Sequence, residues 1–207
     1  MVNVEYIIDF VNYNYSPFSK KQCIKRIALV WIASVALCLV GDKSLLWMIP
    51  LAIADLLLTL LFVGIILKYS KSKVSRYLCD GAFGMHFAVI LNLASYRVAV
   101  IESDTNWLMA VLLLLLLVIG VFVSAFITIL NIKNGKFSKN SMSPKIGALP
   151  YAAGAMGVVF AYFFLQGQSQ QTVLSLISLN LLIISLLVGV TSLNLLKAFL
   201  YMRYVEK

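Results

Sequence analysis

Long apolar stretches, separated by short polar segments, divide this chain from one end to the other. A helix needs about 20 residues, with a range of about 17–25, to cross a hydrocarbon core ~30 Å thick. Six stretches approach or meet that length: residues 26–41, 45–67, 83–101, 107–132, 148–165 and 172–196. Hydrophobic residues make up 62% of the chain and charged residues 12%, against about 45–50% and about 25% in soluble proteins. The sequence therefore predicts an all-α, polytopic membrane protein, a bundle of about six transmembrane helices.

Basic residues indicate how these helices are oriented. Lys and Arg cluster before the first stretch, between the second and third, between the fourth and fifth, and after the sixth. The segments on the opposite side contain one basic residue, Lys43, next to Asp42. Because cytoplasmic loops carry an excess of Lys and Arg, we expect both termini in the cytoplasm. The short loops and the charge bias favour a bacterial inner (cytoplasmic) membrane.

Residues 1–25 differ in pattern from the stretches that follow. Within residues 3–15, apolar side chains recur at helical spacing: Val4, Ile7, Ile8, Val11 and Tyr15. This segment is too short and too polar to cross a bilayer, so we expect an amphipathic helix lying in the membrane interface. A basic cytoplasmic segment follows it. Residues 26–196 then form the transmembrane domain, and residues 197–207 a basic cytoplasmic tail.

Several function classes have no motif in this chain. There is no G-x-x-x-x-G-K-[ST] phosphate loop, no G-x-S-x-G elbow, no H-E-x-x-H pair and no soluble insertion long enough for a catalytic domain. Cys23, Cys38 and Cys79 form no C-x-x-C pair, and His86 is the single histidine, so we expect three free thiols and neither a metal ion nor a cofactor. The net charge of +9 is spread over loops, which disfavours nucleic acid as a partner. The expected partners are the lipid bilayer and other membrane protein subunits.

Polar side chains inside the apolar stretches are the candidate functional residues. A charged group in mid-bilayer is costly, so such residues usually face the interior of the bundle and are often functional. Asp55, near the middle of the second stretch, is the leading candidate for binding a substrate or an ion. The alternative is a structural carboxyl held by a neighbouring helix.

The third and sixth stretches contribute the other candidates. His86 and Arg97 share one helical face and lie about 16 Å apart at 1.5 Å per residue. His86 reads either as a histidine at the cytoplasmic interface or as a proton relay. Arg97 can extend toward the membrane surface or turn inward to Asp55. Asn92 lies on a neighbouring face, and Asn180 on the sixth stretch is a candidate ligand or an interhelical hydrogen-bond donor.

Small residues form seams on three stretches, spaced four apart on the fourth and fifth and along one stripe on the sixth, and such seams favour close helix packing in membranes. They comprise Gly120, Ser124 and Thr128; Ala153, Gly157 and Ala161; and Ser175, Ser178, Ser185, Gly189 and Ser192.

Three functions fit these features. The first is a transporter-type or membrane-complex subunit without a nucleotide-binding domain. The second is a non-transporting scaffold, accessory or immunity-type protein that packs against a larger complex. The third is an intramembrane enzyme that acts on a lipid and uses Asp55 or His86 as an acid–base group. A cavity that reaches Asp55 favours transport, whereas a fully packed bundle favours the scaffold.

Overall fold

The computed structural model describes residues 3–13, 17–39, 45–68, 73–100, 107–137 and 169–205. Within these ranges the chain is helical and contains no strand. The helices are α1 (Val4–Asn12), α2 (Lys20–Leu39), α3 (Leu45–Lys68), α4 (Lys73–Ala99), α5 (Trp107–Lys133), α7 (Gln170–Gly189), the 3-10 turn η2 (Val190–Ser192) and α8 (Leu193–Tyr204). The prediction of an all-α protein is confirmed for this part of the chain.

Five helical segments are long and apolar enough to cross a membrane. They are Lys20–Leu39, Met48–Leu67, Lys73–Ala99, Leu108–Lys133 and Gln170–Tyr204. Large apolar side chains on their outer faces are exposed, among them Leu67, Phe122 and Phe126, as expected where helices face lipid rather than water. The chain is therefore built as a multi-pass helical membrane protein. The predicted stretch 148–165 lies outside the described residues, so the count of six spans stays a prediction.

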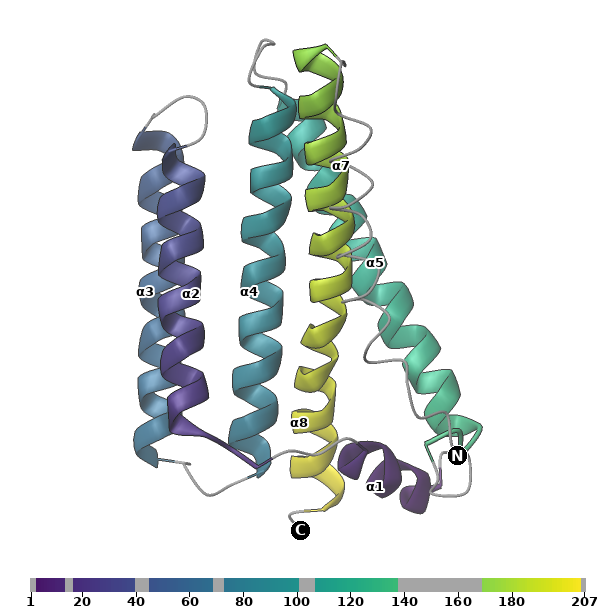
Figure 1. The fold of residues 1–207 in the computed structure, drawn as a ribbon. Helices are drawn as coiled ribbons and strands as arrows, with labels where there is room; N and C mark the ends of the chain where they lie inside the picture. The colour runs from purple at the N-terminus through teal and green to yellow at the C-terminus, as the bar shows by residue number, and fades with distance from the viewer. Residues whose placement is uncertain are drawn as a thin grey trace.

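The long helices stand side by side, and α4 occupies the middle of the bundle (Figure 1). The α2–α3 hairpin packs on one side of α4, and the continuous α7–η2–α8 rod packs on the other. Helix α5 is tilted against this rod, and α1 lies across the end at which α2 and α4 begin (Figure 1). We call this the α1 end of the bundle. The C-terminal part of α8 lies at the same end and contacts α1.

Three helix boundaries differ from the predicted ones, and each helix is longer at the α1 end. Helix α2 begins at Lys20 rather than at 26, and α4 begins at Lys73 rather than at 83. Helix α8 continues to Tyr204, through the segment 197–207 that was expected to be a tail. Charged residues in these extensions suggested loops, but Arg76 and Asp80 pair within α4, and Asp80 also pairs with Arg26 of α2. These ion pairs allow α4 to extend beyond its apolar stretch.

Helix α1 packs on protein. Asn3 caps it, since its side-chain oxygen accepts a hydrogen bond from the backbone N–H of Glu5 at 3.1 Å. Its buried residues, Ile7, Phe10 and Val11, join a core cluster formed with Val74, Tyr77, Ile132 and Ala198 from α4, α5 and α8. Two residues of the predicted apolar stripe, Val4 and Ile8, are instead exposed. The amphipathic pattern was read correctly as a helix, but its main apolar contact is the bundle itself.

Candidate functional site

Asp55 and His86 form the central polar contact between two membrane-spanning helices. The Nε2 atom of His86 lies 2.6 Å from the Oδ1 atom of Asp55. The Asp55 side chain is 1% exposed and that of His86 is 15% exposed. Asp55 therefore has a partner on the neighbouring helix, as a mid-bilayer carboxyl requires, and that partner is the single histidine of the chain.

The two residues lie at the same depth. At a rise of 1.5 Å per residue, Asp55 is about 20 Å from the Lys68 end of α3, and His86 is about 20 Å from the Lys73 end of α4. Both helix ends are at the α1 end of the bundle (Figure 1). An interfacial position of His86 was inferred from an apolar stretch beginning at 83, whereas α4 begins at Lys73 and the contact with Asp55 places His86 level with the middle of α3.

A pocket of about 380 Å³ lies between α2 and α3, and Asp55 forms part of its wall. The lining residues are Trp31, Ser34, Val35, Cys38 and Leu39 from α2, and Met48, Ile49, Leu51, Ala52 and Asp55 from α3. Most of them are apolar, and Val35, Leu39 and Ile49 are exposed on the outer surface of the hairpin. The pocket thus connects the buried carboxyl with the face of the protein that meets the membrane.

Two buried oxygens at this pocket have no hydrogen-bond partner among the described residues. They are the Oδ2 atom of Asp55 and the Oγ atom of Ser34. Ser34 is 4% exposed. A buried polar atom without a partner carries a desolvation cost of about 1–3 kcal/mol, more for a charged group. In a native structure each such atom needs an explanation, such as a role in catalysis or a bound ion or water.

A hydrogen bond between α2 and α3 fixes the indole ring beside this pocket. The Nε1–H of Trp31 donates to Oγ1 of Thr59 at 3.1 Å, and the Thr59 hydroxyl donates to the backbone carbonyl of Asp55 at 2.7 Å. This chain of contacts links the α2 wall of the pocket to the backbone of Asp55 itself.

The remaining predicted candidates do not join Asp55. Asn92 is 1% exposed and donates to the backbone carbonyl of Leu113 on α5 at 3.1 Å. Asn180 donates to the carbonyl of Leu176 in its own helix at 2.9 Å. Arg97 is 5% exposed, but it is eleven residues from His86 on α4, about 16 Å along the helix. The structure therefore brings together Asp55 and His86 and leaves Asn92, Arg97 and Asn180 elsewhere.

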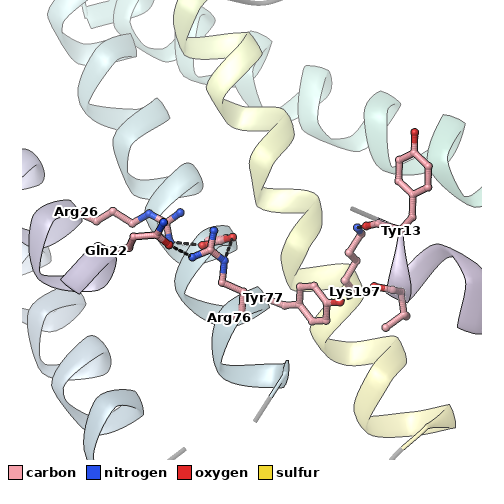
Figure 2. Close-up of polar contacts among 8 residues, drawn as sticks. Tyr13, Gln22, Arg26, Arg76, Tyr77 and Lys197 are labelled. Atoms are coloured by element: carbon pink, nitrogen blue, oxygen red, sulfur yellow. Dashed lines mark hydrogen bonds and ion pairs between the residues drawn. The ribbon is translucent and has the colours of Figure 1, made fainter. Parts of the chain in front are cut away.

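A second polar cluster lies near the α1 end, and none of its residues was among the predicted candidates. Asp80 of α4 forms an ion pair with Arg26 of α2 and a second one with Arg76, whose Nε lies 2.7 Å from Asp80 Oδ2. Arg76 also donates to the side-chain oxygen of Gln22 (Figure 2). The cluster ties the first turns of α2 to those of α4. Its signal in the sequence was the i,i+4 spacing of Arg76 and Asp80, which favours an ion pair on a helix.

The α1 helix is held at the same end by polar contacts from α4 and α8. The hydroxyl of Tyr77 donates to the backbone carbonyl of Val11. Lys197 of α8 donates to the backbone carbonyl of Tyr13 at 2.7 Å (Figure 2). Its ammonium also lies 5.1 Å from the centre of the Phe10 ring. These contacts close the C-terminal end of α1, where the last carbonyls lack intrahelical partners.

The chemistry available at Asp55 and His86 is that of a carboxyl–imidazole pair. Such a pair can share, accept and release a proton, and the carboxylate can bind a cation. Among the described residues, no three His, Cys, Asp or Glu side chains lie close enough together to hold a metal ion. Of the described thiols, Cys23 and Cys79 are buried and Cys38 is partly exposed, and all three are free.

No family of known proteins matches this chain, and comparison with curated proteins and with solved structures found no match either.

Proposed function

We propose that this chain is a transport-type membrane protein whose ion-binding centre is the Asp55–His86 pair. The observation that carries this proposal is the 2.6 Å contact between the two side chains, buried between α3 and α4. The two groups can exchange a proton, and ionisable groups within membrane spans commonly mark ion pathways and proton relays. The pocket beside Asp55 supports the same proposal, since a fully packed bundle would suit a scaffold better.

We propose further that the chain crosses a bacterial inner membrane six times, with both termini in the cytoplasm. Helix α5 ends at the α1 end of the bundle, whereas α7 begins at the opposite end (Figure 1). A sixth crossing through the predicted stretch 148–165 would connect them. Arg26, Arg76 and Lys197 all lie toward the α1 end, which by the distribution of basic residues would be the cytoplasmic one. Helix α1 would then rest at the cytoplasmic membrane surface.

Proton flux into vesicles tests the ion-binding role. Purified protein is reconstituted into liposomes that contain a pH-sensitive dye, and an inside-negative potential is imposed with potassium and valinomycin. We expect faster acidification with the wild-type protein than in protein-free liposomes. Asp55→Asn and His86→Gln should each return the rate to that of protein-free liposomes, because either change removes one half of the proton-exchanging pair.

Asn180→Leu is the matched control, because it removes an intramembrane polar group that bonds only within its own helix in the described contacts. Its flux should equal that of the wild type. The amount of folded protein in each preparation is measured by size-exclusion chromatography before the rates are compared. An Asp55→Asn protein with the wild-type rate would refute the proposal, and so would a wild-type rate no higher than that of empty liposomes.

A second candidate, a subunit or scaffold of a larger membrane complex, is favoured by the packing of α4 against α7. Here Ser95 and Ser178 each donate to the backbone carbonyl of the other, at 2.8 and 2.9 Å. Ser185 donates to the carbonyl of Ala88 at 2.9 Å. This half of the bundle is close-packed, as a structural role requires. Affinity purification from cross-linked native membranes tests it: a stoichiometric membrane partner, together with no flux in liposomes, would favour the scaffold.

A further inference from the structure

The α2–α3 pocket combines an apolar wall with two buried oxygens that face no partner. Asp55 is 1% exposed and Ser34 is 4% exposed, and both line the pocket. The Oδ1 atom of Asp55 is held by His86, so that Oδ2 is the oxygen left for another group. A volume of about 380 Å³ lies in the range of small-molecule sites, about 300–1,000 Å³.

We infer that this pocket binds a small amphiphilic amine, a molecule with one primary ammonium group and a short apolar body. The inference rests on the proposed function, because the same carboxylate would serve as ion-binding centre and as substrate site. An ammonium group supplies donors for Asp55 Oδ2 and Ser34 Oγ, which are the two orphaned acceptors. It also places a positive charge beside the acidic side chain of Asp55.

The wall of the pocket determines the rest of the ligand. None of its described lining residues is basic, and Asp55 is the one charged residue among them, so an anionic ligand would be repelled. Val35, Leu39, Ile49 and Leu51 offer apolar surface, which excludes a sugar or another strongly hydrated molecule because its polar groups would lose their water. The indole of Trp31 adds a flat aromatic face, the best side-chain partner for a cation.

The depth of Asp55 separates a free amine from a lipid headgroup. Asp55 is about 15 Å along α3 from Leu45, the end nearest the pocket. That distance is half of a hydrocarbon core ~30 Å thick. An amine that stays at headgroup level therefore cannot reach the carboxylate, whereas a small amine dissolved in the membrane can. Because Val35, Leu39 and Ile49 are exposed, such a molecule can enter from the membrane between α2 and α3.

Binding is measured with octylammonium as the probe and with octan-1-ol and octanoate as neutral and anionic probes of the same chain. The protein is held in nanodiscs of phosphatidylcholine, which has no primary amine. The readout is the rate at which N-ethylmaleimide labels Cys38, located by mass spectrometry, because Cys38 lines the pocket while Cys23 and Cys79 are buried. We expect octylammonium to slow this labelling at concentrations at least tenfold lower than octan-1-ol does, and octanoate to have no effect.

Variants assign the effect to the pocket. Asp55→Asn should weaken octylammonium protection at least tenfold, since the ammonium loses a hydrogen bond to a charged acceptor, and should leave protection by octan-1-ol unchanged. Ala52→Phe fills the pocket from an exposed lining position and should abolish protection by both probes. Its matched control is Ile53→Phe, at an exposed neighbouring position that does not line the pocket, and this variant should behave as the wild type.

Three results would overturn the inference: equal protection by octylammonium and octan-1-ol, protection by octanoate, or octylammonium protection that persists in Ala52→Phe. If octylammonium no longer slows labelling in nanodiscs that contain phosphatidylethanolamine, the headgroup amine of that lipid already occupies the pocket. This result would also overturn the inference. Proton flux separates this inference from the proposed function. If flux depends on Asp55 but octylammonium does not bind, the proposed function is retained and the substrate class is rejected. If octylammonium binds but no flux is measured, the substrate class is retained and the proposed function is rejected.

Discussion

Gly84 of α4 packs directly on Thr191 of η2: a Cβ atom at Gly84 would lie 1.7 Å from the Oγ1 atom of Thr191 and 2.9 Å from its Cβ atom. One turn earlier, a Cβ atom at Gly81 would lie 2.7 Å from the backbone nitrogen of Leu195. Since small residues let membrane helices approach closely, these two glycines set the distance between α4 and the α7–η2–α8 rod. They also hold His86, two residues after Gly84, in its place on α4.

Alanine at either glycine is therefore expected to destabilise the protein. Gly81→Ala and Gly84→Ala should each lower the free energy of unfolding by about 1–3 kcal/mol, because an added methyl group in a packed interface forces the backbone to shift. Unfolding in SDS, followed by circular dichroism, measures the change. Gly64→Ala on α3 is the control, since a Cβ atom there meets nothing within 4 Å. Equal stability of Gly84→Ala and Gly64→Ala would contradict this account of the interface.

Ser95 and Ser178 form a reciprocal pair of hydrogen bonds across α4 and α7. Ser95→Ala and Ser178→Ala should each cost about 0.6–1.7 kcal/mol, between the average and the largest value measured for interhelical hydrogen bonds in a membrane protein. The double variant should cost less than the sum, because each single change already removes part of the shared contact. SDS unfolding of all four proteins completes the cycle. Ser175→Ala, at an exposed position on α7, should be neutral, and additive effects in the cycle would refute the pairing.

The apolar stretches were enough to predict the helices but not where they begin. Periodicity reports the part of a helix that is buried in lipid or protein. Lys73, Arg76 and Asp80 broke that pattern and were read as a loop, yet Arg76 and Asp80 pair with each other on one helix face. The error moved the start of α4 and with it the apparent depth of His86.

Burial of Asp55 could be predicted from its position, but its partner could not. The partner depends on how α3 is rotated about its axis and on which helix packs against that face, and neither quantity is encoded locally. Arg97 was considered as a partner because of its charge, whereas the structure places His86 there. Ser34 gave no signal at all, since a lone serine in an apolar helix usually bonds to its own backbone.

Helix α1 should be released from the bundle when its polar contacts are removed. Tyr77→Phe deletes the hydroxyl that donates to the carbonyl of Val11, which costs about 1–3 kcal/mol where the carbonyl stays buried without a partner. We expect faster cleavage by trypsin after Lys20 and Lys21, the basic residues of the first turn of α2, because release of α1 removes a restraint on the start of α2. Limited proteolysis with mass spectrometry measures the rate. Tyr204→Phe, at an exposed position, should keep the wild-type rate, and an equal rate for Tyr77→Phe would show that this hydroxyl is not needed to hold α1.

Asp80 neutralises two guanidinium groups, and without it their positive charges should repel each other. Asp80→Asn keeps the size of the side chain but leaves Arg26 and Arg76 close together without a carboxylate. Because these side chains are only 11–21% exposed, the expected loss of stability is about 2 kcal/mol, between the values for exposed and buried ion pairs.

Adding Arg26→Gln to Asp80→Asn should recover part of that loss, since the repulsion disappears. SDS unfolding of the single and double variants decides the point, with Glu5→Gln, a change at an exposed acid of α1, as the control for loss of one negative charge. A double variant less stable than Asp80→Asn would show that Arg26 stabilises the bundle through its cation–π contact with Phe83, whose ring centre lies 5.4 Å from Arg26 Cζ, and not only through its ion pair with Asp80.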